Sequence, residues 1–206
     1  LSTWLERAGA HVAVLTETKT VNGYERYLFG KEWSVAVSSD PRGSQGGVAI
    51  LIRSSLTGCV RCVVQERETE GYLVYVELAA LRSWESSKEE QKTLRIIGNT
   101  GALAPLRAEE PKTLRVIGMY YPVENARLQS VVASTLARWC RDARSRGIEI
   151  AILTDGNSFA QRGHRQYREQ YDAVIACGLE DRFVNKKTRC DERGEESCCD
   201  TIMTSS

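Results

Sequence analysis

Short apolar runs recur along the whole chain, and they constrain its fold more than any other feature. They are rich in β-branched residues and are bounded by glycines or by clusters of polar residues, as β-strands are. The runs are His11–Thr16, Trp33–Ser38, Val48–Arg53, Cys59–Gln65, Tyr72–Leu81, Lys92–Gly98, Lys112–Gly118, Ile148–Leu153 and Ser197–Thr204. Helical segments separate some of these strands, so we predict an α/β or α+β domain built in layers around one core.

The clearest helical pattern covers Glu124–Arg146, where apolar residues recur at steps of three and four and so share one face. This apolar stripe consists of Leu128, Val132, Leu136, Trp139 and Ala143. Gly147 is expected to end the helix. We predict a second helix over Gln166–Cys177, and we expect Ser2–Gly9 to be the last part of a helix.

One segment of the chain is nearly repeated. KTLRIIG at Lys92–Gly98 returns as KTLRVIG at Lys112–Gly118. Two copies are too few for a solenoid, and either a hairpin of two similar strands or a local duplication would produce them. We favour a duplication in which Asn99–Pro111 is an inserted loop. The second copy runs on into MYYP, and we expect it to be the structural strand.

Composition and charge exclude several classes of protein. The chain has 206 residues, of which 42% are hydrophobic, enough for one domain over residues 1–206 with a sizeable core. Its net charge of +1 argues against a constitutive, charge-driven nucleic-acid binder, but not against an enzyme that contacts nucleic acid locally. No apolar run approaches the roughly 20 residues of a membrane span, and the charged start LSTWLERAGA does not resemble a signal peptide. We therefore expect no membrane partner and an intracellular protein, cytoplasmic or nuclear and not secreted.

The seven cysteines are an odd number, and most of them lie in apolar segments. This pattern favours small buried hydrophobic residues in a reducing compartment. Cys59 and Cys62 form a C-x2-C, but positions three apart on a strand point to opposite faces, which is poor geometry for a shared zinc ion. Only Cys190, Cys198 and Cys199 keep a zinc site open as a minor alternative.

Acidic and amide residues stand at or near the ends of several predicted strands. Glu17 follows HVAVLT, Asp155 and Asn157 follow IEIAIL, and Asp200 lies within SCCDTIM. Each of these residues taken singly is most simply a turn residue. Taken together, strand ends are where a sheet holds polar groups around one cleft, and carboxylates without a His/Cys set suit Mg²⁺ or Mn²⁺.

The same segments resemble the endonuclease/exonuclease/phosphatase superfamily. Each match is short, but five occur in the family's order and span almost the whole chain. They are ETK at Glu17–Lys19, GGVAILI at Gly46–Ile52, RVIGMYYP at Arg115–Pro122, LTDGNS at Leu153–Ser158 and CCDTIMTSS at Cys198–Ser206. Within the superfamily, the segments look most similar to the endonuclease domain of non-LTR (LINE-like) retrotransposon polyproteins. The resemblance implies a four-layer α/β sandwich, in which two mostly antiparallel sheets pack together and helices flank them.

The resemblance also implies roles for individual residues. Glu17 would hold the divalent metal, Mg²⁺ or Mn²⁺, and Asp155 would orient or deprotonate the attacking water. Asn157 would hold the scissile phosphate or that water, and Tyr120 would donate a hydrogen bond to the phosphate. Asp200 would orient a catalytic histidine. Hydrolysis of a phosphodiester needs such a set, because a positioned water, a cation and hydrogen-bond donors together stabilise the developing charge.

Two family features are absent from this stretch of sequence: an Asn on a strand ahead of the first helix, and an Asp-His pair after the last strand. We therefore expect a domain truncated at both ends that is inactive or weak alone, with a reverse-transcriptase domain following it in the full-length protein. His11 heads a core strand and is interpreted as structural, and His164 is interpreted as an exposed loop residue.

Basic residues near the expected cleft are candidates for contacts with a nucleic-acid backbone, although solvated surface charge is the simpler interpretation of each. They are Arg162, Arg165, Lys186, Lys187 and Arg189.

Three functions remain open on this basis. The first is a metal-dependent endonuclease that nicks DNA. The second keeps the fold but acts on a phosphomonoester or phospholipid. The third is a catalytically dead copy used for binding, and it is considered because the catalytic histidine is not found in this sequence.

Overall fold

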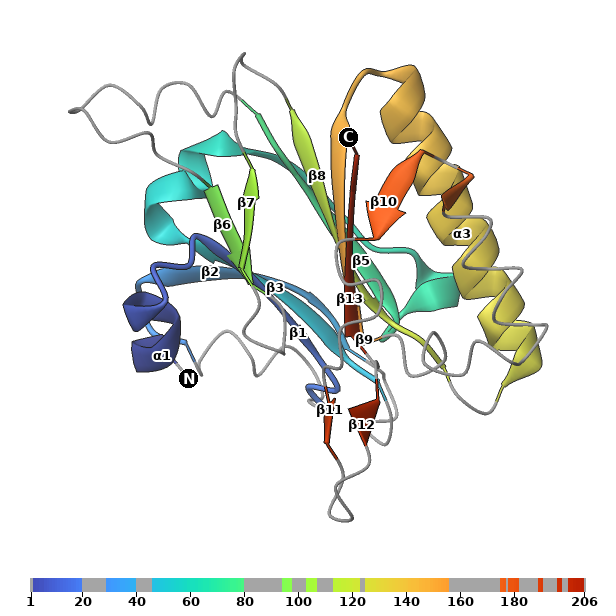
Figure 1. The fold of residues 1–206 in the computed structure, drawn as a ribbon, viewed down its shortest axis with the longest axis horizontal. Coiled ribbons are helices and arrows are strands. Elements are labelled where there is room, and N and C mark those ends of the chain that lie inside the picture. The colour runs from blue at the N-terminus through green and yellow to red at the C-terminus, as the bar shows by residue number, and fades with distance from the viewer. Residues whose placement is uncertain are drawn as a thin grey trace.

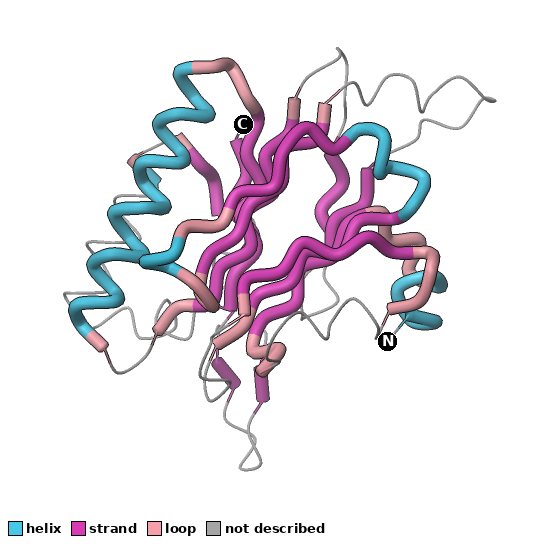
Figure 2. Tube along the Cα trace, turned by 180° about the vertical axis from the view of Figure 1, so that it is seen from behind, coloured by secondary structure: helices cyan, strands magenta, loops and turns pink. Residues whose placement is uncertain are grey.

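The computed structural model describes residues 2–19, 29–39, 46–79, 94–97, 103–106, 113–122, 125–155, 175–176, 178–181, 189–190, 196–197 and 200–205. In these ranges the chain forms two sheets that pack face to face, as Figures 1 and 2 show. A short pair of strands, β11 (Arg189–Cys190) and β12 (Glu196–Ser197), lies apart from both sheets.

The first sheet, called sheet A here, has the strand order β2-β3-β1-β6-β7 in the described part of the chain. Its strands are β1 (Val12–Thr16), β2 (Trp33–Ser38), β3 (Val48–Arg53), β6 (Leu94–Ile97) and β7 (Leu103–Leu106). All neighbours are antiparallel except β1 and β6, which run parallel. β1 and β3 therefore lie at the centre of this sheet.

The second sheet, sheet B, has the order β10-β13-β9-β8-β5-β4 in the same described ranges. Its strands are β4 (Val60–Val64), β5 (Leu73–Leu78), β8 (Leu114–Tyr120), β9 (Glu149–Asp155), β10 (Leu179–Asp181) and β13 (Asp200–Ser205). Here only β8 and β9 are parallel. The prediction of two mostly antiparallel sheets is confirmed.

The main core lies between the sheets and continues under one helix. Val14 and Ile50 of sheet A join Val116 and Leu153 of sheet B in one buried cluster. Gly118 marks the closest approach, since a Cβ there would lie 2.7 Å from a methyl group of Val48. At this position only the absence of a side chain lets the two sheets pack so tightly.

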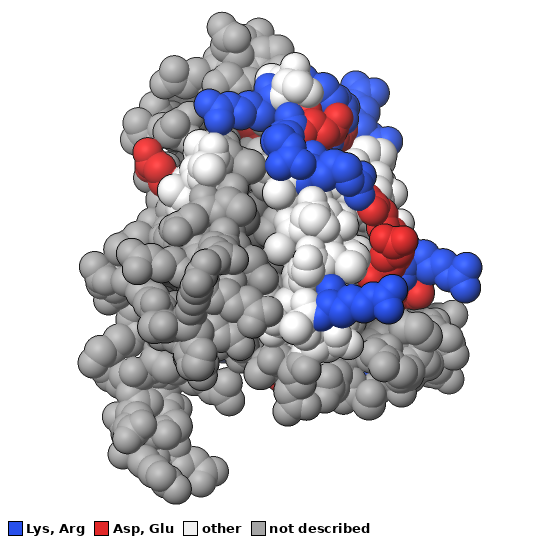
Figure 3. All heavy atoms as spheres, turned by 90° about the vertical axis from the view of Figure 1, so that its right-hand side faces the viewer, with Lys and Arg blue, Asp and Glu red and all other residues white. Residues whose placement is uncertain are grey.

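Helix α3 (Ala126–Ser145) covers the outer face of sheet B. Asn125 caps it by accepting a hydrogen bond from the backbone N–H of Leu128 at 3.0 Å, and Gly147 follows its end at φ +64°. The predicted apolar stripe is confirmed, because Val132, Leu136 and Trp139 are buried. The outward face carries exposed arginines and one exposed carboxylate, namely Arg127, Arg138, Arg141, Arg144 and Asp142. Figure 3 shows basic and acidic side chains next to one another on this side of the molecule.

Helix α1 (Ser2–Arg7) packs on the outer face of sheet A. Its Leu5 joins Ala13 and Leu51 in a second buried cluster, on the side of β1 and β3 that faces away from sheet B. The order of layers is therefore α1, sheet A, sheet B and α3, and the four-layer sandwich is confirmed. Two 3-10 helices, η1 (Ser54–Cys59) and η2 (Arg67–Thr69), flank β4.

The repeated sequence required a correction. Its first copy forms β6, which pairs with β1 in sheet A, and its second copy forms β8, at the centre of sheet B. The two copies do not form a hairpin with each other. The segment Asn99–Pro111 is not simply an inserted loop, because Leu103–Leu106 within it is strand β7, the antiparallel partner of β6. Nearly identical sequences thus occupy different sheets, because strand pairing depends on tertiary neighbours as well as on local sequence.

Other predicted elements have mixed outcomes. Among the described residues, no helix is long and apolar enough to cross a membrane. The helix predicted over Gln166–Cys177 lies almost wholly outside the described residues. The strand predicted over Ser197–Thr204 is divided, since β12 ends at Ser197 and β13 begins at Asp200.

Candidate active site

Glu17 is the first residue after β1, and its backbone has an unusual conformation. Its φ is +54°, and that of Lys19 is +49°. A side chain in this left-handed region costs about 1–3 kcal/mol, and such residues gather at functional sites where the surrounding structure holds them. The Glu17 side chain is 42% exposed, and one carboxylate oxygen lies 3.9 Å from the Lys19 ammonium. The backbone of Glu17 is thus strained, and its carboxylate is accessible to solvent.

Tyr120 is the last residue of β8 and connects sheet B to Glu17. Its hydroxyl donates a hydrogen bond to Oε1 of Glu17 at 2.9 Å, although the two residues are 103 positions apart. The Tyr120 ring is buried and stacks on Tyr72, with centroids 6.1 Å apart. Because a buried, stacked ring has little freedom to turn, its hydroxyl restricts where the Glu17 carboxylate can lie.

The strand register of sheet B brings three polar residues into one row. Tyr120 of β8 pairs with Asp155 of β9, and Asp155 pairs with Asp200 of β13. Asp155 ends its strand and Asp200 begins its own, so the row lies where these central strands end, at one end of the sheet. Glu17 is hydrogen-bonded to the first member of this row. The backbone therefore brings four of the residues singled out in the sequence to one end of the two sheets (Figure 1).

No family model and no curated protein matches this sequence, but solved structures match the fold. The 3′-5′ exonuclease NExo from Neisseria meningitidis gives a TM-score of 0.65 at 16% identity, over 98% of this chain and 79% of that one. NExo from Neisseria, described as a 3′ phosphatase bound to a product DNA hairpin, gives 0.65 at 15% identity with the same coverage. An AP endonuclease from Archaeoglobus fulgidus gives 0.61 at 16% identity, over 100% of this chain and 80% of that one.

These neighbours are members of the endonuclease/exonuclease/phosphatase superfamily. The chain has the endonuclease/exonuclease/phosphatase fold. With sequence identities of 16% or less, the likeness concerns the fold, and the argument about chemistry has to come from the site itself.

The remaining predicted site residues of this endonuclease/exonuclease/phosphatase fold stay predictions. Asn157, Arg162, Arg165, Lys186 and Lys187 lie outside the described residues. Arg189 is placed only as the first residue of β11. The structure thus brings together Glu17, Tyr120, Asp155 and Asp200, and the roles of all the predicted site residues stay predictions.

The donor set at this end suits a hard divalent cation. Within the described ranges, no group of three His, Cys, Asp or Glu residues is close enough to form a complete metal cage. Mg²⁺ does not need such a cage, because it keeps several waters and uses one or two carboxylates. The partly exposed Glu17 carboxylate, fixed by Tyr120, meets that requirement.

Several residues that shape the site were not predicted from the sequence. Tyr72 supports the Tyr120 ring, and its carbonyl oxygen accepts a hydrogen bond from the Tyr120 backbone N–H at 2.9 Å. The Ser38 hydroxyl accepts a hydrogen bond from the backbone N–H of Gly71, and the carbonyl oxygen of Gly71 accepts one from the N–H of Gly47. The sequence signal for this region is the Gly46-Gly47 pair that opens the GGVAILI segment before β3.

Gly47 is expected to tolerate no side chain. Its φ is +91°, and a Cβ there would lie 2.3 Å from the Thr18 hydroxyl oxygen. We predict that Gly47→Ala lowers the free energy of unfolding by about 1–3 kcal/mol, since it adds backbone strain to a clash. Urea denaturation measures the loss. Gly58→Ala is the matched control, because a Cβ there meets nothing within 4 Å. Equal stabilities of the two variants would contradict this account.

Proposed function

We propose that the chain is a divalent-metal-dependent phosphodiesterase domain that nicks DNA. The observation that carries the proposal is the hydrogen bond from Tyr120 to Glu17, made beside the row of Tyr120, Asp155 and Asp200. One exposed carboxylate is thereby fixed next to two further carboxylate positions at the end of both sheets. This is the composition that magnesium-assisted phosphoryl chemistry uses.

Each residue has a proposed task in the reaction. Glu17 would hold Mg²⁺ or Mn²⁺, which when bound supplies positive charge for the phosphate oxygens. Tyr120 orients Glu17 through its hydroxyl, and it would donate to the phosphate only when that hydroxyl turns away from the carboxylate. Asp155 would take a proton from the attacking water, and Asn157 would hold the phosphate or that water. Asp200 would orient a histidine and favour its charged form.

The biological setting is a further part of the proposal. The resemblance to LINE-like endonucleases supports a domain of a retrotransposon polyprotein, joined to a reverse transcriptase. A nick that leaves a 3′-hydroxyl would then prime DNA synthesis. The proposed partner is the DNA backbone, with Arg162, Arg165, Lys186 and Lys187 as candidate phosphate contacts.

A nicking assay under enzyme excess tests the proposed activity. We predict slow conversion of supercoiled plasmid to the open circle with Mg²⁺ or Mn²⁺, and none with EDTA. The nicked ends should be extended by a DNA polymerase without prior treatment, which identifies a 3′-hydroxyl. Absence of metal-dependent nicking under these conditions would refute the proposal.

A phosphomonoester substrate is the second candidate, and one observation favours it. The Neisseria neighbour is described as a 3′ phosphatase bound to a product DNA hairpin. An oligonucleotide with a 3′-phosphate distinguishes the two functions in the same buffer. Release of phosphate without any strand cleavage would favour the phosphatase, and cleavage with retained end phosphates would favour the endonuclease.

A further inference from the structure

Ser38 is a buried hydroxyl whose position the proposed chemistry leaves unexplained. It is the last residue of β2, and it is completely inaccessible to solvent. Its Oγ accepts a hydrogen bond from the backbone N–H of Gly71 at 2.8 Å. Gly71 lies just before β5, so this bond joins sheet A to sheet B. A serine at this point serves the contact between the sheets, since its own strand pairs through the backbone.

The hydrogen bonds continue from Gly71 back to sheet A. The carbonyl oxygen of Gly71 accepts a hydrogen bond from the N–H of Gly47 at 2.8 Å. The carbonyl oxygen of Gly47 accepts one from the N–H of Thr18 at 3.3 Å, and that of Gly46 accepts one from Lys19 at 3.2 Å. We call the sequence of contacts Ser38–Gly71–Gly47–Thr18 the Ser38 series. It ends on the residue that follows Glu17.

The glycines at these contacts leave no room for side chains between the backbone segments. A Cβ on Gly46 would lie 2.8 Å from the carbonyl oxygen of Gly71, and one on Gly47 would lie 2.3 Å from the Thr18 hydroxyl. Gly46, Gly47 and Gly71 all have φ values between +76° and +91°. The backbone segments therefore touch directly, so a displacement of Gly71 is passed on to Thr18.

A second route leads from Gly71 to the same carboxylate. The next residue, Tyr72, stacks on Tyr120 and accepts a hydrogen bond from its backbone N–H. Tyr120 in turn donates to Glu17. Both the backbone that follows Glu17 and the hydroxyl that binds its side chain thus depend on the position of Gly71. The side chain that fixes the Gly71 N–H is that of Ser38, at 2.8 Å.

We propose that Ser38 is a positioning residue that holds the Glu17 carboxylate in place for a divalent cation, by fixing Gly71 between the two sheets. The inference rests on the proposed metal role of Glu17. The left-handed φ of Glu17 has to be held by its surroundings, and the Ser38 series supplies those contacts. Without the Ser38 acceptor, the N–H of Gly71 is buried and unpaired, and the segment around Glu17 is expected to relax.

Ser38→Ala tests the inference with two independent readouts. Hydrogen exchange of the peptide that spans residues 14–19 reports the Ser38 series without any metal, and we expect faster exchange in the variant. The dissociation constant for Mn²⁺, measured from the spin-resonance signal of the free ion, reports how well the Glu17 carboxylate binds the metal. Removing a group that orients a metal ligand typically lowers metal affinity by about 10–100-fold. We therefore expect the Mn²⁺ dissociation constant of Ser38→Ala to rise roughly tenfold.

Two further variants and one kinetic measurement make the result specific. Ser38→Thr keeps the hydroxyl and is expected to restore both readouts toward those of the original chain. Thr135→Val removes a buried hydroxyl from α3, on the far face of sheet B, and is expected to change neither. Where metal-dependent cleavage is measurable, Ser38→Ala should raise the metal concentration for half-maximal rate and keep the rate at saturating metal. A general loss of folded protein would instead lower that saturating rate.

The outcomes separate the inference from the proposed function. Unchanged exchange at residues 14–19 or unchanged Mn²⁺ affinity in Ser38→Ala overturns the positioning role. Mn²⁺ affinity that stays the same in Glu17→Gln overturns the metal role of Glu17, and with it the proposed function, whatever Ser38→Ala does. Weaker Mn²⁺ binding in Glu17→Gln and Ser38→Ala, with faster exchange in the latter and rescue by Ser38→Thr, supports both.

Discussion

Replacement of Glu17 by glutamine is expected to lower metal-dependent cleavage of DNA roughly 100-fold, which corresponds to about 2.7 kcal/mol of transition-state stabilisation. The amide carries no charge to hold a divalent cation. It has nearly the shape of the carboxylate and keeps an oxygen that can accept the Tyr120 hydrogen bond, so the fold should be preserved. Single-turnover cleavage under saturating Mg²⁺ measures the effect.

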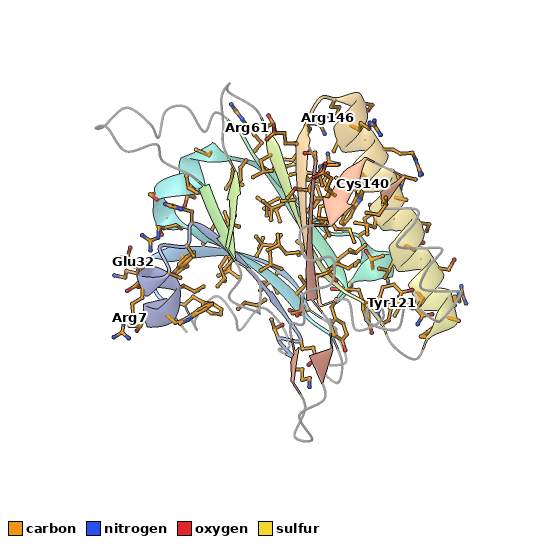
Figure 4. All side chains as sticks on the ribbon, in the orientation of Figure 1. Arg7, Glu32, Arg61, Tyr121, Cys140 and Arg146 are labelled. Carbon is orange, nitrogen blue, oxygen red and sulfur yellow. The ribbon has the colours of Figure 1, made fainter. Side chains whose placement is uncertain are left out.

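A matched control separates this loss from a general effect of charge. Glu32 is an exposed carboxylate near Arg7 in Figure 4, and Glu32→Gln makes the same chemical change away from the site. It should leave the rate unchanged. Tyr120→Phe should lower the cleavage rate by roughly tenfold, less than Glu17→Gln does, because it removes only the hydroxyl that orients Glu17. Glu17→Gln with an unchanged rate would show that Glu17 does not hold the catalytic metal.

Most strands and the main helix were predictable because their signals are local. The helix predicted over Glu124–Arg146 is observed over Ala126–Ser145, where an apolar stripe at helical spacing and a cap at Asn125 act within a few residues. β1 and β3 were predicted almost to the residue, because apolar, β-branched runs bounded by turns describe buried strands well.

Strand pairing and the support of the site could not be predicted in this way. The two KTLR copies have nearly the same local sequence, yet β6 joins sheet A and β8 joins sheet B, because the neighbours differ. Glu17 and Tyr120 were found through a resemblance, which preserves residue types at strand ends. The hydroxyl of Ser38 accepts a hydrogen bond from the backbone of Gly71, 33 positions away, and no periodicity in the sequence indicates such a contact.

The buried position of Arg115 is another feature that local sequence patterns do not predict. Arg115 belongs to the RVIGMYYP segment, in which no pattern indicates a buried charge, yet it is completely buried on the α3 side of sheet B. Its guanidinium donates to Glu77, its register partner on β5, and to Asp142 of α3 at 2.6 Å. It also donates to the carbonyl oxygen of Trp139 at 2.5 Å and lies 4.3 Å from the centre of the Tyr75 ring. These partners come from two elements that are far apart in the sequence, β5 and α3.

This ionic cluster lies far from the proposed active site. Arg115 is near the start of β8 and Tyr120 is at its end. Arg146 also donates a hydrogen bond to Glu77 and lies near the upper end of α3 in Figure 4. Tyr121, the residue after Tyr120, lies near the opposite, lower end of the molecule in the same view. A substitution in the cluster therefore tests the stability of the fold separately from catalysis.

Arg115→Met is expected to lower the free energy of unfolding by about 3–5 kcal/mol, since it leaves the Glu77 carboxylate buried with a weaker set of partners. For a chain of this length, that loss lowers the melting temperature by roughly 10 °C. Calorimetry or thermal denaturation at neutral pH measures the change. Arg61→Met, which alters an exposed arginine on the edge strand β4, is the control and should stay within about 0.5 kcal/mol.

The effect of Arg115→Met should depend on pH in a defined direction. Burial raises the pKa of Glu77, but hydrogen bonds from Arg115 and Arg146 outweigh it and leave the pKa below the ordinary value. A hydrogen bond from Arg115 likewise lowers the pKa of Asp142. Carboxyl groups with lowered pKa values stabilise the fold at pH values above their ordinary pKa. This contribution is lost as the pH falls through the lowered values.

The difference in stability between the original chain and Arg115→Met should therefore be largest near neutral pH and should shrink as the pH falls below about 4. The double variant Glu77→Leu/Arg115→Met should recover part of the loss at neutral pH, because no buried charge is then left without its partner. A stability gap that stays constant from pH 7 to pH 3 would show that Arg115 contributes through packing against Tyr75 and α3, and that its ion pairs add nothing measurable.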